Sequence, residues 1–344
     1  MEIVKSYIFS SAFIFMCNSL YALELSNYDK KIKSSYNITS VTEKLSRDDL
    51  EKNLRDFASS GRPSRAVGSP GHNKSLEFIK AKLTAANSKG ANFSKQEFSQ
   101  NSDKVAKEVK GINLIWEKKG LIKPDEVIIL GANYDTILID AKTQKIDLTG
   151  SMPGADNNAT GVSALLSMIE IFDKLDLPKT VRIVFFDFEE LGLIGSRAYV
   201  EKMLPTIGNQ KIAGFINLTM LGHDSKREDK EKKFNNMKVY LRPPTSKGSE
   251  DDLKLVTLLN NNGKRLYPNI DFIPEANGLN LSSQASFWEV GIPALCFSQN
   301  WESDFNPRFR TSNDFVETLN INTYTNAFRY ITGSLLAWNY DIVK

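Results

Sequence analysis

Apolar runs that alternate with amphipathic segments are the feature that most restricts what this sequence can fold into. The strand-like runs lie at 112–116, 126–130, 180–188, 211–218, 237–241 and 294–297. Helical spacing marks the stretches 46–60, 76–86, 162–175, 190–203, 251–262 and 322–339. Strands that alternate with helices form sheets covered on both faces. The sequence therefore predicts an α/β three-layer sandwich, with a mostly parallel, twisted, mixed sheet flanked by helices.

The first residues have the features of a secretory signal. MEIVK supplies positive charge, residues 6–22 are largely apolar, and Ala22 is a small residue suited to cleavage. A single membrane anchor is the alternative, although Asn18 and the modest length of the run weigh against it. We predict a signal peptide at 1–22, a linker at 23–45 and one α/β domain at 46–344. The mature protein is expected in the periplasm or outside the cell, without membrane association.

Charge and cysteine content exclude some functions. The formal net charge is +3, and no basic block is interleaved with aromatic residues, so nucleic-acid binding is not expected. The two cysteines are Cys17 and Cys296. Once the signal is removed, Cys296 stands alone and is predicted to be a small core residue.

Acidic residues follow the predicted strands. Asp135 lies in GANYDT (131–136), and Glu189 and Glu190 follow the run 180–188. Asp156 opens the segment PGADNNATG (153–161), which leads into a predicted helix. In open α/β sheets the chemistry lies at the carboxyl ends of the strands, so these acids are predicted to form the site.

Several motifs occur in the order found in one protein family, across roughly residues 60–335: RAVGSPGH, GANYDT, PGADNNATGVSALL, VFFDFEELGLIGS, INLTMLG, SSQASFWEVGIPAL and RFRTSNDF. Together they resemble the co-catalytic zinc aminopeptidases of metallopeptidase family twenty-eight, which also contains glutaminyl cyclases and transferrin-receptor-like proteins. The resemblance implies two zinc ions bridged by one Asp, with a Glu that takes a proton from metal-bound water. Asp156 matches the bridging ligand, Glu189 the general base and Glu190 the adjacent ligand. Asp135 matches the carboxylate that orients a ligand.

Three ligand positions depart from this family pattern. Asn133 and Arg310 stand where the family has His, and Thr219 stands where it has Asp. We expect Arg310 to pair with Asp156 or Glu190 and to replace the metal electrostatically, because a guanidinium binds carboxylates through a planar fork. The alternative is an Arg310 that points to solvent. The only histidines in the sequence are His72, in a loop where the family places no ligand, and His223, four residues beyond Thr219.

Three functions follow from these positions. The first is an exported, catalytically impaired or inactive member of the family that binds peptides or protein N-termini and holds no cofactor. The second is an active zinc aminopeptidase that acquires substitute ligands such as Asn133 or His223. The third is an all-carboxylate site for calcium, magnesium or manganese. Whether the chain is an enzyme stays open at this point.

Overall fold

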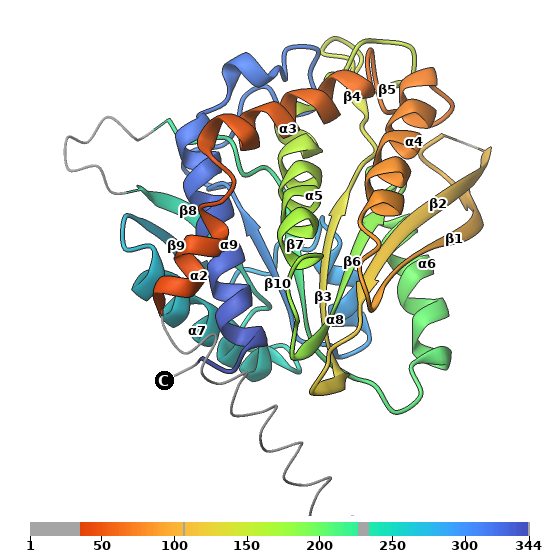
Figure 1. Cartoon of the computed structure of the whole chain (residues 1–344). Helices are drawn as coiled ribbons and strands as arrows, with labels where there is room; N and C mark the ends of the chain where they lie inside the picture. The colour runs from red at the N-terminus through yellow and green to blue at the C-terminus, as the bar shows by residue number, and fades with distance from the viewer. Residues whose placement is uncertain (1–34, 106, 226–233, 343–344) are drawn as a thin grey trace, which may run out of the picture.

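The computed structural model of the chain describes residues 35–105, 107–225 and 234–342 (Figure 1). The predicted signal peptide and Cys17 lie outside these residues, so export stays a prediction. No helix in the described ranges is long and apolar enough to cross a membrane. Cys296 is buried, as expected of a core residue.

A mixed eight-stranded sheet forms the middle layer, in the order β1-β2-β6-β3-β7-β10-β8-β9. Its strands are β1 (Ala91–Ser102), β2 (Lys107–Lys118), β3 (Lys123–Asn133), β6 (Lys179–Phe186), β7 (Lys211–Leu218), β8 (Phe234–Tyr240), β9 (Ile270–Glu275) and β10 (Ala294–Ser298). The central strands β6, β3, β7 and β10 run parallel to one another. β2 is antiparallel to both β1 and β6, and β8 is antiparallel to β10. The predicted α/β sandwich is confirmed.

Alternation along the central strands produces a core on each face of the sheet. Ile128 and Leu130 of β3 belong to the core under α3, α4, α5, α7 and α9, whereas Ile129 belongs to the core under α6 and α8. Figure 1 shows α3, α4 and α5 in front of the sheet. The helices are α3 (Arg47–Ser60), α4 (Pro70–Ala85), α5 (Thr160–Phe172), α6 (Ile194–Met203), α7 (Ser249–Leu266), α8 (Gln284–Glu289) and α9 (Ile321–Asn339).

Several local predictions need correction. The described part of the predicted linker contains a helix, α2 (Ser35–Thr42), whose Ile38 is buried in the core. His72 was expected in a loop but belongs to α4, because Ser69 caps this helix and Pro70 occupies its first turn. The strands β1 and β9 and the short helix α8 were not predicted. Few side chains of β1 and β9 are buried, so the hydrophobic signal of these two strands is weak.

The topology brings the carboxyl ends of β6, β3 and β7 together. These strands are parallel neighbours, so the segments that follow Phe186, Asn133 and Leu218 leave the same edge of the sheet. Arg65 fixes two of the loops at this edge. Its buried guanidinium donates to the carbonyls of Tyr134 at 2.7 Å, and of Pro153 and Gly154 at 2.8 Å each.

Candidate functional site

A pocket of about 70 Å³ opens at this edge of the sheet, and we call it the strand-end pocket. Its polar lining is Asn133, Asn157, Glu189, Glu190, Thr219, Ser282 and Arg310, and its apolar rim is Leu279, Leu281, Trp301 and Phe309. Five of the residues singled out from the sequence thus line the strand-end pocket: Asn133, Glu189, Glu190, Thr219 and Arg310. Asp135 and Asp156 are buried and are not part of the lining.

Arg310 forms an ion pair with Glu190. The Arg310 Nε lies 2.8 Å from Glu190 Oε2, and a terminal guanidinium nitrogen also donates to this oxygen. The other oxygen, Oε1, accepts from Asn157 Nδ2 at 2.5 Å. The Glu190 side chain is 6% exposed and that of Arg310 is 30% exposed. The expected pairing of Arg310 with an acid is confirmed for Glu190, whereas Asp156 is held by Gly222 and Asn306.

Asp156 is held by uncharged donors. Its Oδ1 accepts from Gly222 N at 2.9 Å, and its Oδ2 accepts from Asn306 Nδ2 at 2.8 Å. Asp314 stands behind it and accepts from the backbone N–H of Asp156 at 2.9 Å and of Asn157 at 3.0 Å. Burial, reinforced by the charge of Asp314, raises the pKa of Asp156 to about 7.

Glu189 is directed toward hydroxyl groups. One oxygen accepts from Ser196 N at 2.6 Å, and the other accepts from Ser196 Oγ at 3.0 Å and Ser283 Oγ at 2.9 Å. Burial nevertheless raises the pKa of Glu189 to about 7. A carboxyl group with this pKa exchanges a proton near neutral pH.

Asp135 supports the turn that carries Glu189 and Glu190. Its two oxygens accept from the backbone N–H groups of Glu189 at 3.1 Å and Glu190 at 3.0 Å. Burial and then the charge of Glu190 raise the pKa of Asp135 well above its usual range. Asn133 donates to the Asp135 carbonyl at 3.2 Å and accepts from Asn158 Nδ2 at 3.0 Å. Asn133 is therefore fixed by neighbouring residues at the end of β3.

Sequence reasoning missed Lys104, Asn157 and Asn306. Lys104 lies in the β1–β2 turn and donates from Nζ to the Glu190 carbonyl at 2.9 Å. Partial burial and then the charge of Arg310 lower the pKa of Lys104. No signal in the sequence linked this lysine to the site, because the hairpin itself was not predicted. Asn157 follows Asp156 directly in PGADNNATG, and its amide could have been considered as a donor.

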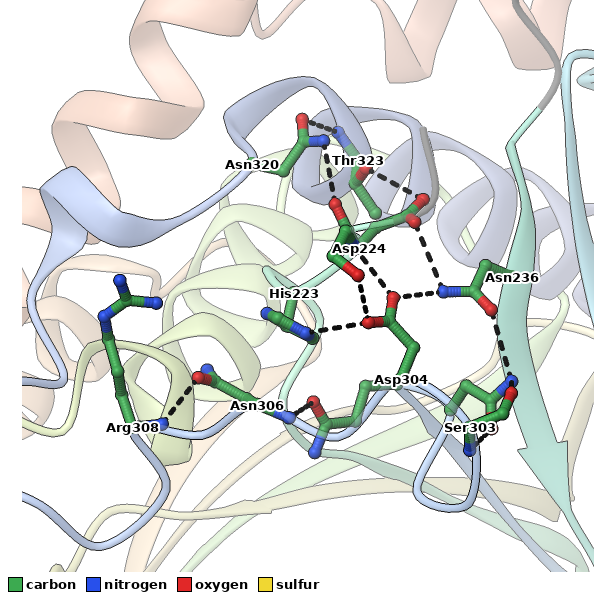
Figure 2. Close-up of polar contacts among 12 residues, drawn as sticks. His223, Asp224, Asn236, Ser303, Asp304, Asn306, Arg308, Asn320 and Thr323 are labelled. Carbon is green, nitrogen blue, oxygen red and sulfur yellow. Dashed lines mark hydrogen bonds and ion pairs between the residues drawn. The ribbon is translucent and has the colours of Figure 1, made fainter. Parts of the chain in front are cut away.

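Neither histidine lines the strand-end pocket. His72 Nε2 lies 2.7 Å from Asp187 Oδ1, and its ring stacks on Tyr134 and Phe188 with centroids 5.4 and 5.1 Å away. His223 lines a separate cavity, and its Nε2 lies 3.3 Å from Asp304 Oδ1. Figure 2 shows His223 beside Asp304. The arrangement gives no support to His223 as a substitute ligand.

The donor set of the pocket does not fit a dinuclear zinc centre. Zinc in proteins takes thiolate, imidazole and carboxylate ligands. Within the described ranges, no group of three or more His, Cys, Asp or Glu is placed to hold a metal ion. The carboxylate oxygens of Asp156 and Glu190 each already accept a protein donor.

Comparison with known proteins identifies the family. The model of peptidase family M28 matches residues 113–334. Leupeptin-inactivating enzyme 1 of Streptomyces exfoliatus is 30% identical over 171 residues, which cover 49% of this chain and 34% of that protein. A probable zinc metalloprotease of Pyrenophora teres f. teres is 25% identical over 212 residues, covering 58% and 44%. The chain thus spans less than half the length of these relatives.

Solved structures show the same fold. The Legionella pneumophila LapA aminopeptidase superposes with a TM-score of 0.68 at 19% identity, covering 90% of this chain and 76% of that one. Porphyromonas gingivalis glutaminyl cyclase gives 0.67 at 19% identity, covering 85% and 98%. The family model accounts for more than half of the sequence, and the solved structures share the fold. The chain belongs to peptidase family M28.

Proposed function

We propose that this chain keeps the M28 fold as a peptide-binding protein and does not carry out zinc-dependent peptide hydrolysis. The observation that carries the proposal is the occupation of the residual ligand oxygens. Arg310 and Asn157 hold the two oxygens of Glu190, and Gly222 and Asn306 hold those of Asp156. A dication would have to displace these donors before it could bind.

The electrostatics of Arg310 also oppose zinc. A guanidinium stays charged at all physiological pH values, so it neutralises Glu190 permanently and repels a second cation at short range. A guanidinium does not lower the pKa of a bound water as zinc does. Arg310 therefore supplies the charge balance of a metal without supplying the nucleophile.

The remaining features of the pocket suit a peptide end. Two acids line the pocket, and Arg310 pairs with one of them, Glu190. The other acid, Glu189, is a suitable partner for the α-ammonium group of a peptide. Leu279, Leu281, Trp301 and Phe309 form an apolar rim on which a first side chain would lie. Recognition would then combine a buried acid with an apolar surface.

An active aminopeptidase is the second candidate. The observation in its favour is Glu189, whose pKa of about 7 suits a general base. Relatives named zinc metalloprotease and leucine aminopeptidase agree with that activity. The all-carboxylate site for calcium, magnesium or manganese has less support, because Asp135 and Asp156 point their oxygens at protein N–H groups.

Metal analysis of the purified protein, combined with hydrolysis of a leucine anilide with and without added zinc, tests the proposal. We expect substoichiometric zinc and no turnover above background. The triple variant Asn133→His, Thr219→Asp, Arg310→His is expected to gain zinc affinity. Stoichiometric zinc in the native protein, with turnover that disappears in Glu189→Gln, would overturn the proposal.

A further inference from the structure

A buried hydroxyl group without a recorded partner lies at the strand-end pocket. Thr219 lines this pocket and is 5% exposed. Its backbone N–H donates to Phe297 O at 3.2 Å, which continues the pairing of β7 with β10 and fixes the residue. For its Oγ1, no hydrogen-bond partner is recorded among the described residues, and this oxygen is not one of the side-chain atoms closed off from solvent. The proposed function gives this hydroxyl no role.

Ser282 supplies a second hydroxyl to the same pocket. Its Oγ accepts from Nδ2 of the buried Asn217 at 2.6 Å, so its own O–H proton remains to be donated. Among the described residues, the neighbour recorded for this proton is the thiol of Cys296, and sulfur is a weak acceptor. Asn217 therefore fixes the Ser282 oxygen and leaves the donor available to a ligand oxygen.

β7 directs the two hydroxyls to one wall of the pocket. Asn217 and Thr219 are two residues apart on an extended chain, so their side chains lie on the same face of the sheet. Asn217 holds Ser282 on that face, and Thr219 follows at the end of the strand. The wall thus offers two hydroxyl donors to a ligand.

The same wall adjoins Glu189. Ser283, the residue after Ser282, donates to Glu189 Oε2 at 2.9 Å. Within the described ranges, Ser196 N is the donor recorded for Oε1, at 2.6 Å, so this oxygen retains a lone pair. A group that pairs with Glu189 is therefore held close to the Ser282 hydroxyl. In an amino-acid amide only two carbon atoms separate the ammonium nitrogen from the carbonyl oxygen, so one peptide end reaches both partners.

We propose that Thr219 and Ser282 hold the first carbonyl oxygen of a bound peptide, so that the pocket selects an α-amino amide over a simple amine. The inference rests on the proposed function, in which Glu189 receives the α-ammonium group. Hydroxyl donors suit this contact, because a carbonyl oxygen accepts two hydrogen bonds and brings no charge to compensate. A ligand without the carbonyl would leave both hydroxyls unpaired, which gives the selectivity.

Calorimetric titration of the full chain with leucinamide and with 3-methylbutylamine at pH 7 tests the inference. The second probe has the same apolar side chain and an ammonium group but no carbonyl, and both amines are largely charged at this pH. We expect leucinamide to bind about tenfold more tightly. Equal affinities would overturn the inference and leave ammonium recognition by Glu189 intact. No binding of either probe up to about 10 mM would overturn the proposed function, and this inference with it.

Two variants locate the contact. Thr219→Val keeps the shape of the side chain and removes its hydroxyl, and Ser282→Ala removes the other donor. Each should weaken the binding of leucinamide about fivefold and leave the affinity for 3-methylbutylamine within about twofold, because only the carbonyl contact is lost. Thr219→Ser retains a hydroxyl and should bind leucinamide with near-native affinity.

Thr257→Val, which removes an exposed hydroxyl on α7, is the matched control and should bind both probes as the native protein does. Native affinity for leucinamide in Thr219→Val and Ser282→Ala would show that the assignment is wrong. An equal loss for both probes in Thr219→Val would reveal a structural role and overturn it as well. If that variant does not fold, Ser282→Ala decides by the same criteria, because Ser282 is partly exposed.

Discussion

Two regions of the molecule contain buried carboxylates, and the pKa values of these carboxylates shift in opposite directions in the two regions. In the strand-end pocket, burial raises the pKa of Glu189 and that of Asp156 to about 7. In the second region, which we call the Asp304 cluster (His223, Ser225, Asn236 and Asp304; Figure 2), the pKa of Asp304 is lowered. Burial acts to raise it there too, but hydrogen bonds from Ser225 and the neighbouring His223 outweigh that effect.

The difference lies in how many acids share the available donors. Asp304 accepts from Ser225 N at 2.8 Å, and Ser225 Oγ and Asn236 Nδ2 also donate to it. The strand-end pocket instead crowds several acids together, and neutral donors alone do not compensate them. A fixed cation such as Arg310 is then required. The comparison indicates that Arg310 balances the charge of Glu190, which the neutral donors nearby do not.

The largest expected effect concerns Glu189. The pKa of Glu189 rises from 4.5 in the unfolded chain to about 7 in the folded protein. Between these two pH values the folded state holds a proton that the unfolded state has released. The free energy of unfolding therefore falls as the pH rises through this window. Glu189→Gln removes the titration, and the Ser196 and Ser283 hydroxyls can reorient to meet an amide. We expect the variant to be about 2–3 kcal/mol more stable than the native protein at pH 8.

Urea unfolding at pH 5 and pH 8 measures this effect. Glu201→Gln, an exposed position on α6, is the control and should leave the pH dependence unchanged. Equal pH dependence in Glu189→Gln and the native protein would show that the pocket does not hold a proton on Glu189.

The second prediction breaks the ion pair. Arg310→Leu leaves Glu190 buried among other acids, and we expect a loss of about 2 kcal/mol in the free energy of unfolding, moderated because Arg310 is partly exposed. Arg197→Leu breaks the exposed pair with Glu289 and should cost at most about 0.5 kcal/mol. Adding Glu190→Gln to Arg310→Leu should restore part of the loss. Equal losses in the two arginine variants would remove the argument for charge balance.

The third prediction concerns the Asp304 cluster. Asp304→Asn places an amide donor among existing donors, and we expect a loss of about 1–2 kcal/mol at pH 7, measured by urea unfolding. Because the folded pKa of Asp304 lies below the unfolded value of 3.8, its contribution is present above that value and is lost as the pH falls further. The pH dependence therefore has the opposite sign to that of Glu189. Asp251→Asn, on the exposed face of α7, is the control.

The smallest effect tests the apolar rim. Leu281 is 80% exposed, so Leu281→Ser should leave stability unchanged. It should weaken binding of a leucyl peptide about fivefold, because about 1 kcal/mol of apolar contact is lost. Leu253→Ser, at an exposed leucine of α7, is the matched control. An N-acetylated peptide should bind weakly to all three proteins; if it binds as well as the free amine, Glu189 does not recognise the ammonium group.

The sequence was sufficient to predict the α/β fold and the pairing of Arg310 with an acid. Apolar runs and helical spacing identified the central strands, because those segments are buried on both faces. The replacement of a ligand by Arg310 was visible, and charge complementarity predicted its pairing with an acid. The choice of Glu190 over Asp156 was not predictable, because it depends on Asn306 and Gly222 holding Asp156 in the folded chain.

Contacts between segments that are distant in the sequence could not be predicted either, because they too depend on the folded chain. Lys104 meets Glu190 across 86 residues of chain, and only the pairing of β1 with β2 brings it there. β1 is largely exposed, so its pattern carries little hydrophobic signal. α4 begins at Pro70, six residues before the predicted helix 76–86, because the cap at Ser69 precedes the residues with clear helical spacing.

The segment 304–310 contributes side chains to the Asp304 cluster and to the strand-end pocket. Asp304 ties it to His223, Asn306 ties it to Asp156, Arg308 lines the cavity that His223 also lines, and Arg310 closes on Glu190. A displacement of this one segment would therefore disturb the donors of Asp156 and the cation of Glu190 together.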